Sequence, residues 1–410
     1  MKKEELFTQS NSKLVVSLIF DEMHLKKNIH FDGKNFIGGV DLGDEFNTKY
    51  SDKAQGNEAS EVLVFMVNAV NMKFRIPVAY FFINSLSAVK KADLLSACIE
   101  KINKIGVIIS NVTFDGPAVN VSMANHLGAN MKPETLDPRI GLKLFDLPYL
   151  VVLFDPPHMI KLIRNSLGSL KFLKIGSQKI SWHYFEELFL LQNKTGLHLA
   201  NKLTKCHIEW ESKKMKVSYA TQLFSQSIAA ALDYCRDVLK LPQLEGSEAT
   251  SGFCRIMNTL FNIMNSSYPN VNFDSKAAIS ANNKEEWRNI FDETSLYIRK
   301  LFTPQGIRII DDKKKTGFIG ILSNIEALKL VYLNLVDSDI LNYIPTRKLN
   351  QDPIGKHTIF NDSINPPPLS TLTILISFFF KSTFLDVSEL VWAATIIQAH
   401  LNLFGKDLSV

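Results

Sequence analysis

The sequence predicts an α/β protein in which a mixed β-sheet is interrupted by a large all-helical insertion. Apolar, strand-like runs alternate with turns over residues 14–115, and helical periodicity replaces them from about residue 160 to residue 310. A long helical pattern then resumes at residues 316–335. With 410 residues, the chain exceeds what one hydrophobic core usually serves, so we expect two or more lobes.

Two of the predicted strands end in an aspartate. The run 14–20 is dense in β-branched and aromatic residues and is followed by Asp21. The run 107–114 is followed by Asp115, and Pro117 then stops the strand ladder. Aspartate after a strand is also an ordinary turn residue, so spacing alone leaves a structural interpretation open.

The segment between these two strands predicts how they are arranged. Three apolar runs separated by turns predict strands: Phe36–Val40, Val62–Val70 and Arg75–Ile83. An amphipathic helix is predicted at 88–105. Antiparallel strands, a crossover and a strand ending in aspartate follow the order of an RNase H-like sheet, in which the strands before Asp21 and Asp115 are adjacent. Paired carboxylates at such an edge can hold one or two Mg²⁺ ions, which prefer oxygen ligands.

Five segments are expected along the chain. They are a disordered N-terminus at 1–13, the first part of the sheet domain at 14–165, the helical insertion at 166–310, the second part at 316–354, and a divergent apolar tail at 355–410. The helix at 316–335 is expected to be amphipathic. The charged run 311–315 before it is a solvated linker or a contact to DNA phosphate.

Composition narrows the class of protein only slightly. The net charge of +5 permits nucleic-acid binding without requiring it. The four cysteines are far apart and form no CxxC pair, which argues against a zinc module and a secreted disulfide framework. The uncharged run 369–380 is too short to span a bilayer, which leaves a buried helix, an interfacial segment and a stretch with no selected fold open. No membrane partner is expected.

Several motifs resemble the P-element transposase family, including its THAP-domain relatives. The motifs lie at residues 20–26, 31–34, 39–43, 113–120, 154–165, 196–204, 215–217 and 315–318. The resemblance covers about residues 14–354. It implies an RNase H-like core with a GTP-binding insertion domain, and Mg²⁺- or Mn²⁺-dependent DNA cleavage and strand transfer. Asp21 and Asp115 would then be the catalytic metal ligands.

The resemblance also implies a guanine site. Phe261 would stack on the base, Asn265 would bond to it, and Asp352 would accept hydrogen bonds from the guanine donors. Asn262 stands where an aspartate is common in the family, and an amide lacks the charge that strengthens such a bond. GTP is therefore a possible cofactor.

The chain departs from the family at the third carboxylate. In the family a glutamate follows an Asp-Pro-hydrophobic triplet, whereas here Asp352, Pro353 and Ile354 are followed by Gly355. We therefore expect a transposase core truncated at both ends and catalytically impaired. The alternative is a non-catalytic, domesticated or truncated regulator that binds DNA, GTP or protein.

Two basic groups are candidates for DNA contacts. Asp155 and His158 precede Lys161 and Arg164 on one predicted helix. This set is either a carboxylate near the metals followed by a basic face for the DNA backbone, or a helix N-cap with a solvated basic face. The lysines at 213–216 next to Trp210 form either a solvated turn or a DNA contact.

The expected partner is DNA at transposon ends. No Cys-Cys-Cys-His zinc finger precedes residue 14, so we expect specificity for those ends to be weak or lost. A homo-oligomer or a full-length transposase is a possible protein partner. Nuclear localisation is expected from the DNA substrate alone.

Overall fold

A six-stranded mixed sheet forms the larger lobe of the computed structural model. The structure describes residues 13–25, 29–31, 36–50, 58–141, 147–196, 199, 201–269 and 276–351. The strand order is β5-β4-β1-β6-β8-β7. The strands are β1 (Val15–His24), β4 (Glu61–Ala69), β5 (Arg75–Ile83), β6 (Ile108–Phe114), β7 (Arg139–Ile140) and β8 (Leu150–Phe154). Because β1 pairs antiparallel with β4 and parallel with β6, the predicted mixed sheet is confirmed.

Two strand predictions differ from the structure. The predicted strand at 36–40 is reduced to β3 (Phe36–Ile37), which pairs with β2 (His30–Phe31) outside the main sheet. Gly38 follows with φ of 115°, a conformation that ends the strand. In contrast, β1 continues past the predicted end at residue 20, because β4 pairs with it as far as His24.

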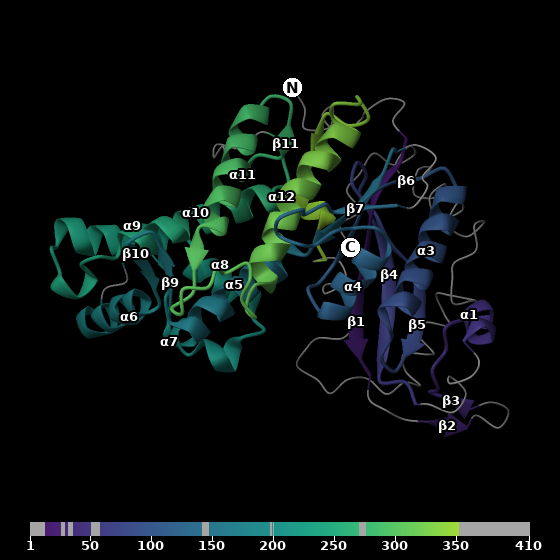
Figure 1. The fold of residues 1–410 in the computed structure, drawn as a ribbon, viewed down its shortest axis with the longest axis horizontal. Helices are drawn as coiled ribbons and strands as arrows, with labels where there is room; N and C mark the ends of the chain where they lie inside the picture. The colour runs from purple at the N-terminus through teal and green to yellow at the C-terminus, as the bar shows by residue number, and fades with distance from the viewer. Residues whose placement is uncertain are drawn as a thin grey trace.

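Helices cover the central strands of the sheet. Figure 1 shows α3 (Ala88–Lys104) and α4 (Ala118–His126) on one side, and α5 (Pro156–Leu170) and α12 (Thr316–Leu335) towards the other. Every residue of β6 and β8 is buried, as expected for strands covered on both faces.

The bounds predicted for α12 are confirmed, but its predicted amphipathic character is wrong. By length and hydropathy alone, α12 is the one helix among the described residues that could span a membrane. However, 78% of its apolar window is buried inside the protein. It packs against α5, α11 and β8, so both of its faces are apolar because it is a core helix.

The smaller lobe is mostly helical. Its elements are α6 (His183–Thr195), α7 (Lys205–Ile208), η1 (Trp210–Lys213), α8 (Val217–Leu223), α9 (Gln226–Asp233), η2 (Tyr234–Val238), η3 (Pro242–Leu244), α10 (Glu248–Met264) and α11 (Lys284–Arg299). A small sheet of order β10-β9-β12 also lies here, so the prediction of an entirely helical insertion was wrong.

This small sheet has a clear physical origin. Its strands are β9 (Phe172–Ile175), β10 (Gln178–Ser181) and β12 (Leu301–Phe302). The turn between β9 and β10 contains Gly176, whose φ is 55°. Leu173 and Ile180 pair across the hairpin, and both are buried. The sequence therefore contained a hairpin signal, two short alternating runs around a glycine turn, that the helical periodicity masked.

A row of phenylalanines crosses the main sheet. The ring of Phe20 on β1 lies 5.2 Å from that of Phe65 on β4 and 5.4 Å from that of Phe114 on β6. The row continues from Phe65 to Phe81 on β5 and from Phe114 to Phe154 on β8. These buried aromatic contacts hold five neighbouring strands at one level of the sheet.

Candidate active site

Three aspartates follow the phenylalanine row directly. Asp21, Asp115 and Asp155 come immediately after Phe20, Phe114 and Phe154, on neighbouring strands. These three carboxylates therefore lie at one edge of the sheet.

The pairing register explains why the aspartates meet. Ile19 pairs with Thr113, so Asp21 and Asp115 each stand two residues further along parallel neighbours. In the same way, Phe114 pairs with Phe154 across β6 and β8, so the residues that follow them, Asp115 and Asp155, are also at the same level of the sheet. The predicted adjacency of the strands that lead to Asp21 and Asp115 is confirmed.

The carboxylates of Asp21 and Asp115 are half-buried and close enough to repel each other. Burial, together with the nearby charge of Asp115, raises the pKa of Asp21 to about 7, although the backbone N–H of Glu22 donates to its Oδ1 at 2.9 Å. Burial also raises the pKa of Asp115, and His158 opposes that rise. A divalent cation would relieve this repulsion, so the two side chains fit a metal chemically. Within the described part of the chain, no group of three or more His, Cys, Asp or Glu residues is arranged to hold a metal.

Asp115 is held in place from two helices. Asn120 on α4 donates from Nδ2 to Oδ1 of Asp115 at 2.9 Å. Lys91 on α3 donates to Oδ1 of Asn120 at 2.8 Å and also pairs with Glu22. Lys91 is only 1% exposed. The sequence-based prediction missed Lys91, Asn120 and Glu22 as supports of the site. Asn120 and Glu22 are close in sequence to Asp115 and Asp21, but only the packing of α3 against α4 brings Lys91 to them.

Asp155 links the sheet edge to the end of the described chain. It caps α5, accepting a hydrogen bond from the backbone N–H of His158 at 3.1 Å, and the His158 ring lies at 3.2 Å. Its other oxygen accepts from the backbone N–H of Gln351 at 2.9 Å, and the Gln351 side chain donates to the carbonyl of Phe20. Asp155 is therefore an N-cap that also lies beside the other two carboxylates.

Comparison with known proteins identifies both lobes. Residues 1–128 match the family model described as TNP-like, RNase H N-terminal domain, and residues 157–277 match TNP-like, GTP-binding insertion domain. The Homo sapiens DNA transposase THAP9 is 28% identical over 340 residues, which is 82% of this chain. The chain carries both TNP-like domains and is homologous to the THAP9 and P-element transposases. It is also 26% identical, over 71% of its length, to the Drosophila melanogaster transposable element P transposase.

A solved structure supports the same assignment. The Drosophila P element transposase strand transfer complex matches with a TM-score of 0.67 at 25% identity, covering 83% of this chain and 70% of that one. The match confirms the RNase H-like fold. The aligned region spans 37% of the length of each of the two curated relatives.

Lys161 and Arg164, expected on a solvated basic face of α5, are instead buried. Lys161 is 4% exposed and lies within electrostatic range of the three aspartates; burial lowers its pKa and the carboxylates oppose that change. Arg164 is 0% exposed, and burial lowers its pKa to about 10. Its Nη2 donates to the backbone carbonyls of Lys213 and Lys214, both at 3.2 Å. The sequence-based expectation of accessible DNA contacts at these two residues was wrong, because α5 is covered on both sides.

The candidates for guanine binding lie at the end of α10. Phe261 and Asn262 are half-buried there, and Oδ1 of Asn265 accepts a hydrogen bond from the side chain of Asn350 at 3.1 Å. The structure thus brings the end of α10 to the segment that leads to Asp352. Asp352 itself and Gly355 lie outside the described residues.

Proposed function

We propose that this chain is the RNase H-like core of a DNA transposase, in which Asp21 and Asp115 hold one or two divalent ions, Mg²⁺ or Mn²⁺. The observation that carries the proposal is the β1–β6 register, which aligns two half-buried carboxylates at one sheet edge within a transposase family fold. The bound metal would supply positive charge to a DNA phosphodiester and to the attacking hydroxyl.

The chain's own residues would prepare this site. Asn120 orients Asp115, and Asp155 fixes the start of α5 beside the metal-binding pair. Lys161 adds a buried positive charge that offsets the carboxylates before metal enters. Preorganised charge of this kind lowers the cost of bringing an anionic phosphate to the site.

Catalysis is expected to be weak. Gly355 stands where the family places a glutamate, and misplacing a reacting group by about 1 Å can cost on the order of 100-fold in rate. The same substitution favours a second candidate function, a regulator that binds DNA, GTP or a full-length transposase without cutting DNA. Phe261, Asn262, Asn265 and Asp352 are the proposed GTP contacts, and the nucleus is the proposed location in both cases.

The test is calorimetric titration of Mn²⁺ and Mg²⁺ into the purified chain. Asp21→Asn and Asp115→Asn should each abolish the binding seen with the wild type. Asp44→Asn, on the exposed first turn of α1 (Asp44–Lys49), removes the same charge elsewhere and should leave binding intact. Binding that is unchanged in both site variants would refute the proposed metal ligands.

A DNA cleavage assay then separates the two candidate functions. Nicking that requires metal and disappears in Asp21→Asn supports the enzyme. Metal binding without any cleavage supports the regulator. Nicking that persists in Asp21→Asn comes from a contaminating nuclease.

A further inference from the structure

Two lysine clusters that lie 100 residues apart in the sequence are anchored to one stretch of α5. The carbonyls of Lys213 and Lys214 accept hydrogen bonds from Arg164, and Asn165 donates to the Lys214 carbonyl at 3.2 Å. The next residue, Ser166, donates to the carbonyl of Lys314 at 3.1 Å. Three consecutive residues of α5 thus anchor the backbones of both clusters.

The anchoring is rigid on the side of the first cluster. Trp210, at the start of η1, packs so closely on α5 that a Cβ added at Gly168 would clash with its indole ring. Arg164 is fully buried beneath the η1 loop. Its guanidinium donates to the backbone carbonyls of Lys213 and Lys214, whereas the side chains of these two lysines are exposed to solvent.

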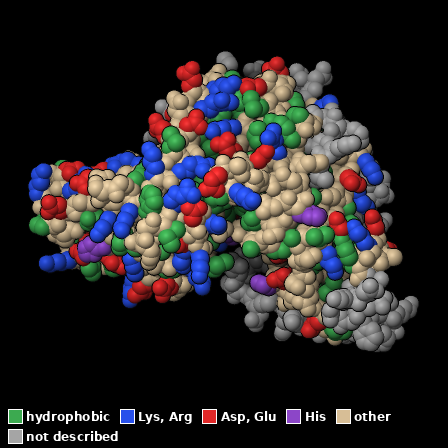
Figure 2. Space-filling model, in the orientation of Figure 1, with side chains coloured by type: hydrophobic (Ala, Val, Ile, Leu, Met, Phe, Trp, Pro, Cys, Tyr) green, Lys and Arg blue, Asp and Glu red, His purple; other side chains and the backbone are tan. Residues whose placement is uncertain are grey.

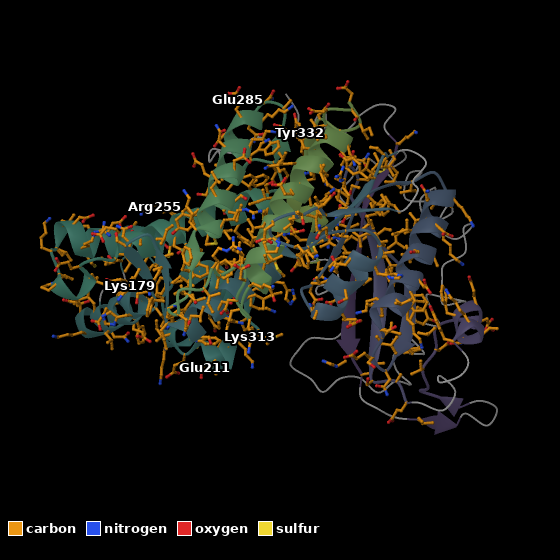
Figure 3. All side chains as sticks on the ribbon, viewed as in Figure 1. Lys179, Glu211, Arg255, Glu285, Lys313 and Tyr332 are labelled. Carbon is orange, nitrogen blue, oxygen red and sulfur yellow. The ribbon has the colours of Figure 1, made fainter. Side chains whose placement is uncertain are left out.

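The result is one exposed basic surface, which we call the α5 lysine surface. It consists of Lys213, Lys214, Lys216, Lys313, Lys314 and Lys315. All six are exposed, and none forms an ion pair with another described residue. The acidic groups beside them are Glu209, Glu211, Asp311 and Asp312, of which Glu209 pairs with Lys205 and Asp311 with Arg308. Figure 3 shows Lys313 and Glu211 both on the lower side of the insertion lobe in this view, and Figure 2 shows Lys and Arg denser over the insertion than over the sheet lobe.

The position of this surface relative to the aspartates suits extended DNA. Asp155 caps the first turn of α5, and Arg164 lies nine residues later, so the surface is roughly 14 Å from the carboxylate edge along the helix axis. Phosphates along one strand of B-DNA repeat about every 3.4 Å. The lysines would therefore meet the backbone about four nucleotides from a phosphodiester at the carboxylates.

We infer that the α5 lysine surface binds the phosphate backbone of duplex DNA next to the carboxylate edge, independently of base sequence. The inference rests on the proposed function for its choice of DNA as the polyanion. Its physical basis is six exposed lysines that pair with no acidic group among the described residues, on two loops that hydrogen bonds hold to a single helix.

The test measures binding without catalysis. A fluorescently labelled duplex of random sequence is titrated with the full chain in EDTA, at several salt concentrations, and followed by anisotropy. The variants are Lys213→Glu with Lys216→Glu, and Lys313→Glu with Lys315→Glu. The matched control is Lys194→Glu with Lys240→Glu, an identical charge change at two other exposed lysines of the insertion. Equal melting temperatures establish that all variants fold; a variant that melts lower is replaced by its glutamine counterpart.

Each surface variant should bind on the order of tenfold more weakly than the wild type. The slope of log K against log salt should also become shallower by about 1.8, because each lost phosphate contact contributes about 0.9. The control should change neither quantity by a comparable amount. Wild-type affinity in the surface variants, an equal loss in the control, or no duplex binding by the wild type would each overturn the inference.

The outcome is independent of the metal proposal. DNA binding is measured in EDTA, whereas the metal titration of Asp21→Asn is a separate experiment without DNA. If the lysine variants weaken DNA binding while Asp21→Asn still binds metal, the surface stands and the proposed metal ligands fall. The reverse result refutes the surface alone.

Discussion

The sheet edge and the end of α10 are both candidate sites, but they are assembled in different ways. At the sheet edge, Asp21 and Asp115 meet because two neighbouring strands pair in one register. At the end of α10, Asn265 meets Asn350, which is 85 residues away, only through tertiary packing. The order of the strands predicts the first site, whereas the second was expected only through the family resemblance, because the packing of distant segments leaves no local pattern in the sequence.

The largest expected change in stability comes from Thr346, which joins the segment before Asn350 to the end of α10. Its hydroxyl accepts from the backbone N–H of Ser266 at 2.9 Å and donates to the carbonyl of Ile263, and all of these groups are buried. Thr346→Val would leave two backbone groups without partners and should lower the free energy of unfolding by about 2–3 kcal/mol. Denaturant titration measures this change.

We expect the effect of Thr346→Val to be confined to the end of α10 and not to reach the sheet edge. Thr346→Ser keeps the hydroxyl and should cost under about 1 kcal/mol. The metal titration of the Thr346→Val variant, under conditions where it is folded, should match the wild type. Loss of metal binding in that variant would show that the two sites are coupled, contrary to the comparison.

The second effect, at the sheet edge, depends on pH. The pKa of Asp21 is raised from 3.8 to about 7, so the metal-free folded state holds a proton that the unfolded chain releases between these values. Asp21 therefore contributes to the free energy of unfolding most fully below about pH 4, and this contribution is lost as the pH rises through 7. Asp21→Asn should therefore be more stable than the wild type at pH 8 by on the order of 1–2 kcal/mol, and the difference should shrink towards pH 4.

Thermal unfolding in EDTA across this pH range checks the prediction. Adding Mg²⁺ at pH 8 should raise the melting temperature of the wild type but not of Asp21→Asn. A stability difference between the two proteins that does not vary with pH would mean that Asp21 titrates normally.

The smallest effect concerns the β9–β10 hairpin of the insertion. Gly176 has φ of 55°, and open space surrounds the position of an added Cβ, so only backbone strain opposes substitution. Gly176→Ala should destabilise the protein by about 1 kcal/mol, and Gly176→Asn by less, because asparagine tolerates the left-handed conformation better. Equal losses for alanine and asparagine in denaturant titration would point to a cause other than backbone conformation.

The parts of the fold that could be predicted share a local origin. The strand pattern around Asp21 and Asp115 and the bounds of α12 follow from periodicity within short segments. The signal for the β9–β10 hairpin is also local. It was missed because its two four-residue strands are much shorter than the helical pattern on either side. The reduction of the strand at 36–40 depended on a single glycine conformation.

The mixed sheet, the adjacency of the strands before Asp21 and Asp115, and the resemblance to transposases could all be read from the chain, because strand periodicity and motif spacing are properties of contiguous residues. The burial of Lys161 and Arg164, the contact of Lys91 with Asn120, and the shared anchoring of two distant lysine clusters on α5 became visible only in the folded protein. Whether a side chain of a helix is buried or paired depends on the elements that pack against that helix. The sequence of the helix alone does not show which elements these are.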